Sequence, residues 1–193
     1  MRLYHGSNIG NIKKLQPNKA DHERPYVYMS TIEIVAAFYM CNAVEKPYYW
    51  FPYGFAQNSQ IPIYHELYPN ALREVSEGVS GYIYEVDVSD EQVICFKNIP
   101  CARLATQPID VVECKQITNA YDLFMQYVEQ GKMYISRFED KTKEQLNWWY
   151  NELVEYLKDK DMIQNPDCSY ALFVKKNLPQ VWDKYLKQNT KGV

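Results

Sequence analysis

The segment that decides the fold class is residues 25–41, which read PYVYMSTIEIVAAFYMC. Its first five residues are rich in tyrosine and valine and predict a short β-strand. Ser30 and Glu33 then have the spacing of a helix capping box, and Ile34, Phe38 and Cys41 continue at helical intervals. A strand that passes directly into a helix predicts a chain of mixed α and β structure.

Four other short segments have the composition or the alternation of β-strands. In residues 81–88, GYIYEVDV, tyrosine and valine alternate with the residues between them, which is the period-two pattern of a strand with one buried face. The other candidates are residues 3–5, 92–96 and 109–117. We expect residues 6–8 to form a turn after the first strand.

Residues 47–70 hold four prolines and many aromatic side chains without clear periodicity, so we predict an irregular excursion there. Loops of this length often act as lids or binding loops. Their aromatic residues fit either a lid over a bound acceptor or a satellite core beneath the loop. These residues are Tyr48, Tyr49, Trp50, Phe51, Tyr53 and Phe55. His65 and Glu66 have the chemistry of an acid/base pair, but adjacent side chains diverge, so a surface loop is expected.

The pattern becomes mostly helical after Thr118, which predicts a domain over residues 1–118 and a helical extension, residues 119–193, packed on it. Four helices are expected in this half. The first ends at Gly131, the second begins at a capping box at Thr142, and two shorter ones cover residues 167–177 and 179–189. The Trp148–Trp149 pair lies on the second of these helices. One indole is expected to pack against the first domain while its neighbour leans aside.

The composition is that of a globular protein, with 47% apolar and 23% charged residues. A net charge of -3 lacks the basic excess of a surface that binds phosphate backbones, so nucleic acid is not an expected partner. Tyrosine is abundant, with 18 residues. Because tyrosine combines a flat apolar ring with a polar tip, this excess favours a role in recognition.

Several kinds of chemistry lack their sequence signatures. Five cysteines without a C-x-x-C pair favour a reducing compartment, and no stretch has the form of a signal peptide or a membrane span, so we expect a cytoplasmic protein with no membrane partner. The three histidines have no familiar metal-ligand spacing, so no metal site is expected. Glycine-rich phosphate loops and the G-x-S-x-G elbow of hydrolases are also missing.

The remaining candidate chemistry lies at the start of the chain. His5 ends the first predicted strand and Gly6 follows it, so an imidazole stands beside a backbone that a flat ligand could approach closely. Tyr28 lies on the second strand, and Tyr39 follows eleven residues later in the helix. Two tyrosine rings on either side of a slot would clamp an aromatic ligand.

These residues resemble the ADP-ribosyltransferase superfamily, in its poly(ADP-ribose) polymerase-like branch, which includes the small bacterial rifampicin-modifying transferases. The resemblance rests on Leu3-Tyr4-His5-Gly6-Ser7, on Tyr26-Val27-Tyr28-Met29-Ser30, on the Tyr28–Tyr39 spacing and on the strand at 81–88. It covers about residues 1–118 and implies a split antiparallel sheet that binds NAD as co-substrate.

The resemblance also assigns roles to individual residues. His5 would bind the adenosine-side ribose, the backbone of Gly6 would pair with the nicotinamide amide, and Tyr28 and Tyr39 would sandwich the nicotinamide. Ser7 and Ser30 complete the NAD-binding set. The catalytic residues would be His5, Tyr28 and Gln107.

Two departures from the family pattern bear on the mechanism. Ala36 stands where a hydroxyl residue often bonds the carboxamide, and Gln107 stands at the place of the third signature residue, usually glutamate. Breaking the nicotinamide–ribose bond builds cationic character on the sugar, which a carboxylate stabilises and a glutamine does not. Another carboxylate could replace it, and the candidates are Asp87, Asp90, Glu91, Asp110 and Glu113.

The implied function is therefore transfer of a single ADP-ribose unit from NAD to an acceptor, either a protein or a small molecule. A second possibility is a module on a degenerate fold that binds NAD, ADP-ribose or another protein without catalysis. A third is the NAD-dependent RNA 2′-phosphotransferase of the same superfamily, which the acidic first half disfavours.

Overall fold

The computed structural model describes residues 1–19, 24–42, 52–56, 59–96 and 99–189. Its largest sheet has six strands, and every neighbouring pair is antiparallel. In spatial order the strands are β10 (Glu113–Ile117), β6 (Gly81–Asp87), β1 (Arg2–Ser7), β3 (Val27–Ser30), β8 (Ala102–Ala105) and β7 (Ile94–Cys95). The mixed α+β class predicted from the sequence is confirmed.

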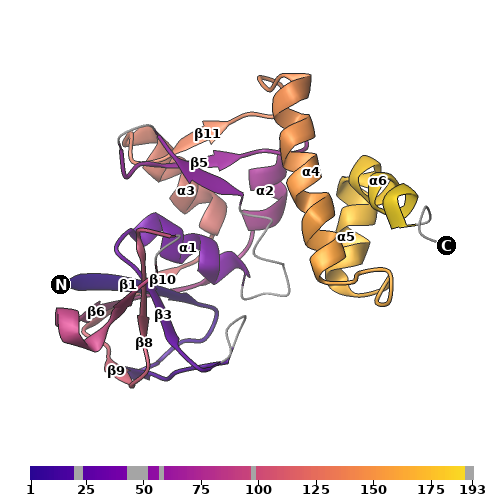
Figure 1. The fold of residues 1–193 in the computed structure, drawn as a ribbon. Coiled ribbons are helices and arrows are strands. Elements are labelled where there is room, and N and C mark those ends of the chain that lie inside the picture. The colour runs from indigo at the N-terminus through magenta and orange to yellow at the C-terminus, as the bar shows by residue number, and fades with distance from the viewer. Residues whose placement is uncertain (20–23, 43–51, 57–58, 97–98, 190–193) are drawn as a thin grey trace.

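Two smaller sheets flank the large one. The first has the order β11 (Tyr134–Ser136), β5 (Pro62–His65) and β4 (Tyr53–Phe55), and its β11–β5 pair is parallel. The second pairs β2 (Lys14–Leu15) with β9 (Ile109–Asp110). Figure 1 shows helix α1 (Glu33–Asn42) between the six-stranded sheet and the three-stranded one.

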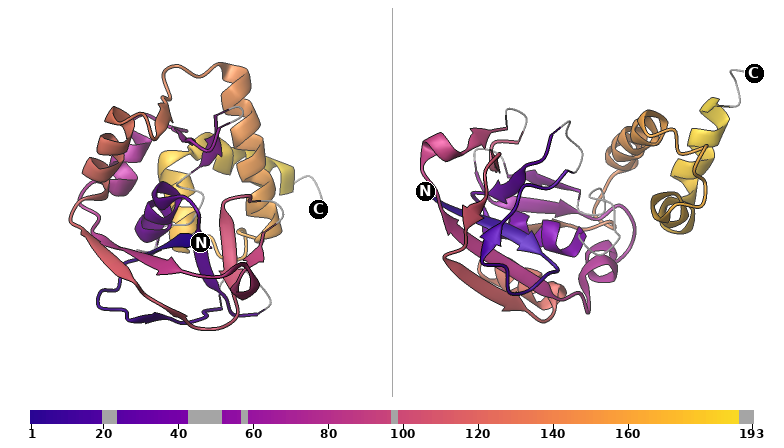
Figure 2. Two further views of the ribbon diagram at one scale, coloured as in Figure 1. Left: turned by 90° about the vertical axis from the view of Figure 1, so that its left-hand side faces the viewer. Right: turned by 90° about the horizontal axis from the view of Figure 1, so that it is seen from below.

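The remaining helices lie over the three-stranded sheet and beyond it. They are α2 (Ala71–Ser76), α3 (Ala120–Glu129), α4 (Lys143–Asp159), α5 (Ser169–Asn177) and α6 (Pro179–Asn189), with a short 3₁₀ turn, η2, at Asp90–Gln92. In the right-hand view of Figure 2, α4, α5 and α6 lie at one end of the molecule, away from the six-stranded sheet. No helix in the described ranges has the length and apolarity needed to cross a bilayer.

Two hydrophobic cores form on opposite faces of the six-stranded sheet. The larger extends from α1 through Tyr64 of β5 and Phe124 of α3 to Tyr185 of α6. The smaller, built around Leu3 and Val86, is closed by the β2–β9 pair. The C-terminal helices therefore share the core of the first half of the chain.

Local signals placed the start of α4 and the end of α3 correctly. Thr142 and Gln145 form the predicted capping box, in which Thr142 Oγ1 accepts the Gln145 N–H at 3.2 Å and Gln145 Oε1 accepts the Thr142 N–H at 2.9 Å. Gly131 adopts a left-handed φ of 66° just after α3. At Ser30 the predicted box is wrong, because Ser30 Oγ accepts the Ile32 N–H at 3.0 Å and Glu33 pairs with Lys115.

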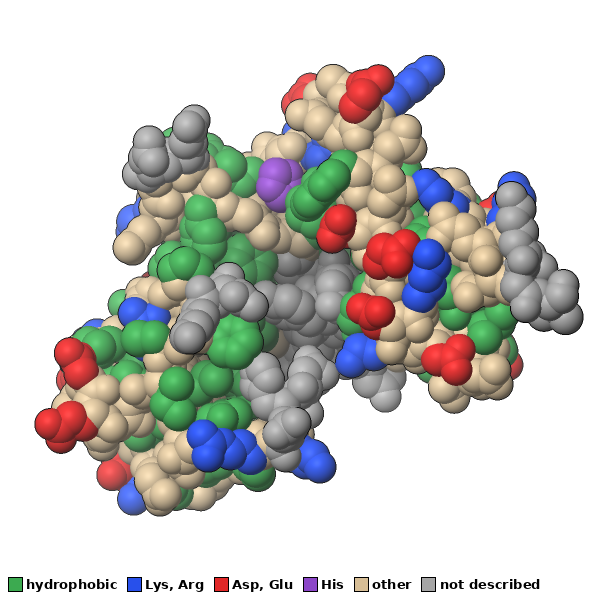
Figure 3. Space-filling view, viewed as in Figure 1, with side chains coloured by type: hydrophobic (Ala, Val, Ile, Leu, Met, Phe, Trp, Pro, Cys, Tyr) green, Lys and Arg blue, Asp and Glu red, His purple; other side chains and the backbone are tan. Residues whose placement is uncertain are grey.

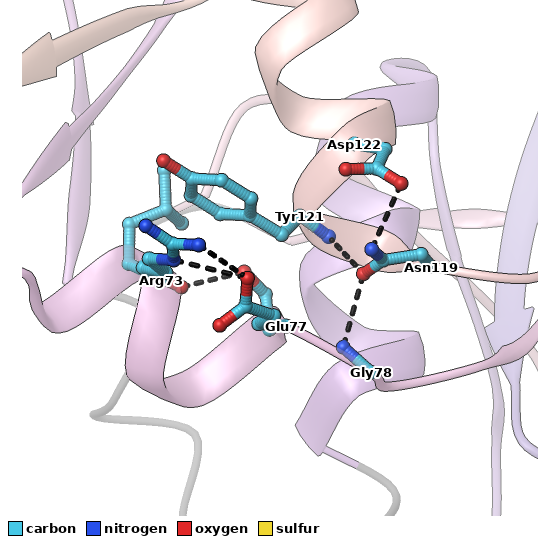
Figure 4. A network of polar contacts seen from close by, with 8 residues as sticks. Arg73, Glu77, Gly78, Asn119, Tyr121 and Asp122 are labelled. Carbon is cyan, nitrogen blue, oxygen red and sulfur yellow. Dashed lines mark hydrogen bonds and ion pairs between the residues drawn. The ribbon is translucent and has the colours of Figure 1, made fainter.

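A polar junction joins α2 to α3 (Figure 4). Asn119 caps α3, where its side-chain oxygen accepts the N–H groups of Tyr121 at 3.3 Å and Gly78 at 3.0 Å. Gly78 has a φ of 72°, the left-handed region that favours glycine. One side chain thus closes the end of α2 and the start of α3 together.

Several strand predictions are corrected by the structure. Gly6 and Ser7 continue β1 instead of turning, because they pair with Ile83 and Tyr82 of β6. The predicted excursion over 47–70 contains the β4–β5 hairpin, and its residues 47–51, 57 and 58 lie outside the described residues. The single strand predicted over 109–117 is divided into β9 and β10. The strands β8 and β11 and the helix α2 gave no sequence signal that we recognised.

Candidate functional site

The predicted site lies where β1 and β3 separate. The two strands share one pair, Tyr4 with Ser30, although β1 continues to Ser7. Beyond that pair, His5 Nδ1 donates to the backbone carbonyl of Tyr28 at 2.7 Å. The structure therefore brings His5 and Tyr28 together through a side-chain-to-backbone hydrogen bond across the split.

This hydrogen bond and the burial of His5 determine the tautomer and the charge of the imidazole ring. Burial lowers the pKa of His5 below its ordinary value, and the carbonyl of Tyr28 partly offsets that effect. Since a carbonyl only accepts, Nδ1 carries the proton, and in the neutral ring Nε2 is an acceptor. His5 can therefore accept a hydrogen bond from a ligand hydroxyl.

Gly6 is required by the protein's own packing. A Cβ atom at this position would lie 1.9 Å from the Ala36 carbonyl oxygen and 2.7 Å from the Met40 nitrogen, both in the backbone of α1. The side of Gly6 on which a Cβ would lie is therefore in close contact with α1. Ala36, at 1% exposure, and the half-buried Tyr39 belong to the same helix.

Alternation along the strands divides the candidates between two faces. Leu3, Val27 and Met29 belong to the smaller core, so His5 and Ser7 share the face of Leu3, and Tyr28 points to the opposite face, toward α1. The ring of His5 accordingly lies 6.5 Å from that of Tyr84, another member of the smaller core. The α1 face therefore holds Tyr28, Gly6 and the helix that carries Tyr39.

The side chains of Ser7 and Ser30 accept hydrogen bonds from nearby backbone N–H groups. Ser7 Oγ accepts the Ile9 N–H at 3.1 Å, as Ser30 Oγ does that of Ile32, and both serines are buried. These bonds fix the turns at the ends of β1 and β3, which position the split.

Gln107 follows the strand that lies across β3 from this split. It is exposed, in the bend between β8 and β9, two residues beyond the pair of Ala105 with Val27. Because β8 lies on the far side of β3 from β1, Gln107 is placed beyond the start of β3. It precedes β9, which belongs to the small β2–β9 ladder.

The candidate carboxylates are placed elsewhere as well. Asp87 pairs with Arg2 at 3.2 Å, at the opposite end of β1 from Gly6, and Asp110 pairs with Lys14 at 3.0 Å. The others lie in η2 or at the exposed start of β10, and they are Asp90, Glu91 and Glu113. Among the described residues, no His, Cys, Asp and Glu side chains gather as a metal site would require.

His65 and Glu66 do not form a surface loop, which corrects that prediction. Glu66 is 1% exposed and accepts the Leu72 N–H at 3.3 Å and a bond from Arg137 Nη1 at 3.4 Å. His65 belongs to β5 and packs on Trp149, with ring centroids 5.1 Å apart. Burial, together with the nearby charge of Lys141, lowers the pKa of His65 to about 4.

A feature that the sequence did not reveal is a cleft of about 570 Å³ between the β4–β5 hairpin and α4. Trp149 packs on His65 as expected of one member of the tryptophan pair, while Trp148 is 56% exposed in the same cleft. Trp148, Glu152, Glu155 and Asp159 recur at helical spacing on one stripe of α4. This spacing, which places three acidic residues and Trp148 on one side of the helix, is the sequence pattern that indicates this face of α4.

Comparisons with models of protein families, with curated proteins and with solved structures returned no match.

Proposed function

We propose that the protein binds NAD at the split between β1 and β3 and transfers a single ADP-ribose unit to an acceptor, as members of the ADP-ribosyltransferase superfamily do. The observation that carries the proposal is the hydrogen bond between His5 and the Tyr28 carbonyl at the point where the two strands separate. It joins two of the residues on which the resemblance rests, although they are 23 positions apart.

Each residue has a distinct task in this proposal. Nε2 of the neutral His5 ring accepts a hydrogen bond from a ribose hydroxyl, and the backbone of Gly6 pairs with the nicotinamide amide. Tyr28 and Tyr39 lie against the two sides of the pyridine ring. When the glycosidic C–N bond breaks, neutral nicotinamide leaves with the bonding electrons. A nucleophilic atom of the acceptor forms the new bond to the ribose carbon, and its proton passes to solvent.

A second candidate, binding of NAD or ADP-ribose without transfer, is favoured by what surrounds the split. Gln107 is exposed beyond the start of β3, and Asp87 and Asp110 are engaged in ion pairs with Arg2 and Lys14. Without a carboxylate beside the sugar, the positive charge of the transition state would be poorly stabilised.

One experiment separates the two candidates. The protein is titrated with NAD while its melting temperature and the release of nicotinamide are measured. NAD at a hundredfold excess over its Kd should stabilise the fold by about 2.7 kcal/mol, which for this chain length is a rise in Tm of roughly 5–10 °C. A rise with nicotinamide release supports transfer, and a rise without it supports binding alone. If neither occurs, both candidates are wrong.

Variants test which residues bind NAD. Tyr28→Ala should weaken NAD binding about 3- to 10-fold, because one side of the stacked ring is lost, and Tyr28→Phe should restore most of it. His5→Ala should also weaken binding. Tyr134→Ala, which removes a tyrosine 48% exposed on β11, is the matched control and should bind NAD as the parent does.

A further inference from the structure

The cleft on α4 lies outside the residues assigned to NAD. Its walls are Pro52 and β4, Leu67 just after β5, the turn at Ile99 and Pro100, and one side of α4. A volume of about 570 Å³ is within the range of sites that hold organic ligands and far above what one ion or water needs. Its most prominent side chains are aromatic or acidic.

The aromatic part of the cleft has the form of a corner. The rings of Trp148 and Trp149 meet at 78° with centroids 4.8 Å apart. Trp149 is held by its contact with His65, whereas Trp148 is 56% exposed. Such perpendicular aromatic walls attract cations through the negative faces of their rings. Tyr156, another aromatic residue of the cleft, has Lys160 Nζ 5.7 Å from its ring centroid, although Lys160 itself does not line the cleft.

The charged part of the cleft is acidic. Glu152, Glu155 and Asp159 line it, and its described lining contains no lysine, arginine or histidine. Glu155 is paired with Lys158 at 2.7 Å. Within the described part of the chain, Glu152 and Asp159 have neither an ion pair nor a hydrogen bond, so two carboxylates remain for a ligand. Figure 3 shows acidic side chains spaced along α4 beside hydrophobic ones.

We propose that this cleft binds a basic segment of a partner polypeptide, with one cationic side chain in the tryptophan corner and against Glu152 and a second beside Asp159. Glu152 and Asp159 are seven positions apart on α4, which is about 10 Å at 1.5 Å per residue. In a segment with the polyproline-II conformation, which has three residues per turn and a rise of about 3.1 Å, side chains three residues apart lie on one face about 9 Å from each other. The volume and the two carboxylates together favour a segment over a single small cation.

The test uses the full chain and an acetylated, amidated peptide of sequence Arg-Gly-Gly-Arg, with the Glu-Gly-Gly-Glu and Ser-Gly-Gly-Ser peptides for comparison. Binding is measured by calorimetry and by tryptophan fluorescence at two salt concentrations. The arginine peptide alone should bind, and more weakly at the higher salt, because solvent-exposed ion pairs are screened. If the serine peptide binds equally well, the proposal is wrong.

Variants test the two halves of the cleft separately. The double variant Glu152→Gln/Asp159→Asn should bind the arginine peptide about 5- to 10-fold more weakly, and Trp148→Ala about 2- to 5-fold more weakly. The control is Glu129→Gln/Asp183→Asn, which changes the net charge equally at exposed positions outside the cleft and should bind as the parent does.

Three outcomes would overturn the proposal. The control could weaken binding as much as the cleft variant, which would indicate a general charge effect. The cleft variants could leave binding unchanged. Arginine amide alone could bind as tightly as the peptide, in which case the occupant is a small organic cation. Because the residues tested are not those assigned to NAD, a failure here leaves the proposed function standing.

Discussion

Replacing Gly6 by alanine tests how the fold is built around the proposed site. The new Cβ would lie 1.9 Å from the Ala36 carbonyl oxygen and 2.9 Å from the carbon of the same carbonyl, whereas real Cβ contacts are essentially never shorter than 3.0 Å. Both atoms belong to the backbone of α1, so no side chain can rotate away. The strand and the helix must separate by about 1 Å.

The cost of that separation follows from what α1 touches on its other side. Phe38 of α1 packs against Phe124 of α3 at 5.1 Å and against Tyr53 of β4 at 5.4 Å between ring centroids. A shift of α1 therefore presses on a filled core. Overpacking usually costs about 1–3 kcal/mol, and we expect the upper end of that range. For a chain of this size that lowers the melting temperature by roughly 6–12 °C.

Urea and thermal melts followed by circular dichroism measure the effect, with Gly54→Ala as the matched control. At Gly54, on β4, the nearest atom to an added Cβ is His65 Nε2 at 3.5 Å, an ordinary contact. That variant should remain within about 1 kcal/mol of the parent. Equal stability of Gly6→Ala and Gly54→Ala would refute the reasoning, because it would mean that α1 does not press on β1.

Two further predictions concern single side chains. Asn119→Ala removes the acceptor for the N–H groups of Gly78 and Tyr121 and should lower the free energy of unfolding, measured in urea, by about 1–2 kcal/mol. Asn119→Ser should recover part of this loss. An unchanged urea midpoint would contradict the role of Asn119 as the cap of α3. Because the pKa of His65 is about 4 in the folded state and about 6.5 when unfolded, the unfolded chain takes up the proton first, and stability falls as the pH drops from 6.5 to 4. Solvent screening limits this loss to about 1–2 kcal/mol. His65→Phe should flatten the stability profile in that window, apart from a remainder due to His5, and an equally steep profile would contradict the assignment.

The elements predicted correctly are those whose signals are local. The α3 stop at Gly131 and the α4 cap at Thr142 depend on residues a few positions apart. The missed strands depend on distant partners: β8 forms on β3, and β11 adds to β5. The β4–β5 hairpin was hidden by its prolines, one of which, Pro62, is the first residue of β5, a position that proline tolerates.

The sequence suggested the residues of the candidate site but not how they are arranged in space. His5 contacts Tyr28 because β1 and β3 are neighbouring strands. The sequence does not indicate which strands pair, so this contact could not be predicted from it. The position of Gln107 relative to β3 depends on β8, which precedes it and pairs with β3 but gave no sequence signal. For Gly6 the residue type was informative, because an added Cβ would collide with the backbone of α1.

Helix α1 explains why the C-terminal half belongs to the same core. Ile34, Val35, Ala36, Ala37, Phe38, Met40 and Cys41 are all buried, so this helix is covered nearly all round. The six-stranded sheet covers the side at Gly6, and only elements outside that sheet can cover the side at Phe38. Phe124 of α3 and Tyr64 of β5, a strand that β11 extends, provide that cover. The change in sequence pattern near Thr118 therefore marks a change in secondary structure within one shared core.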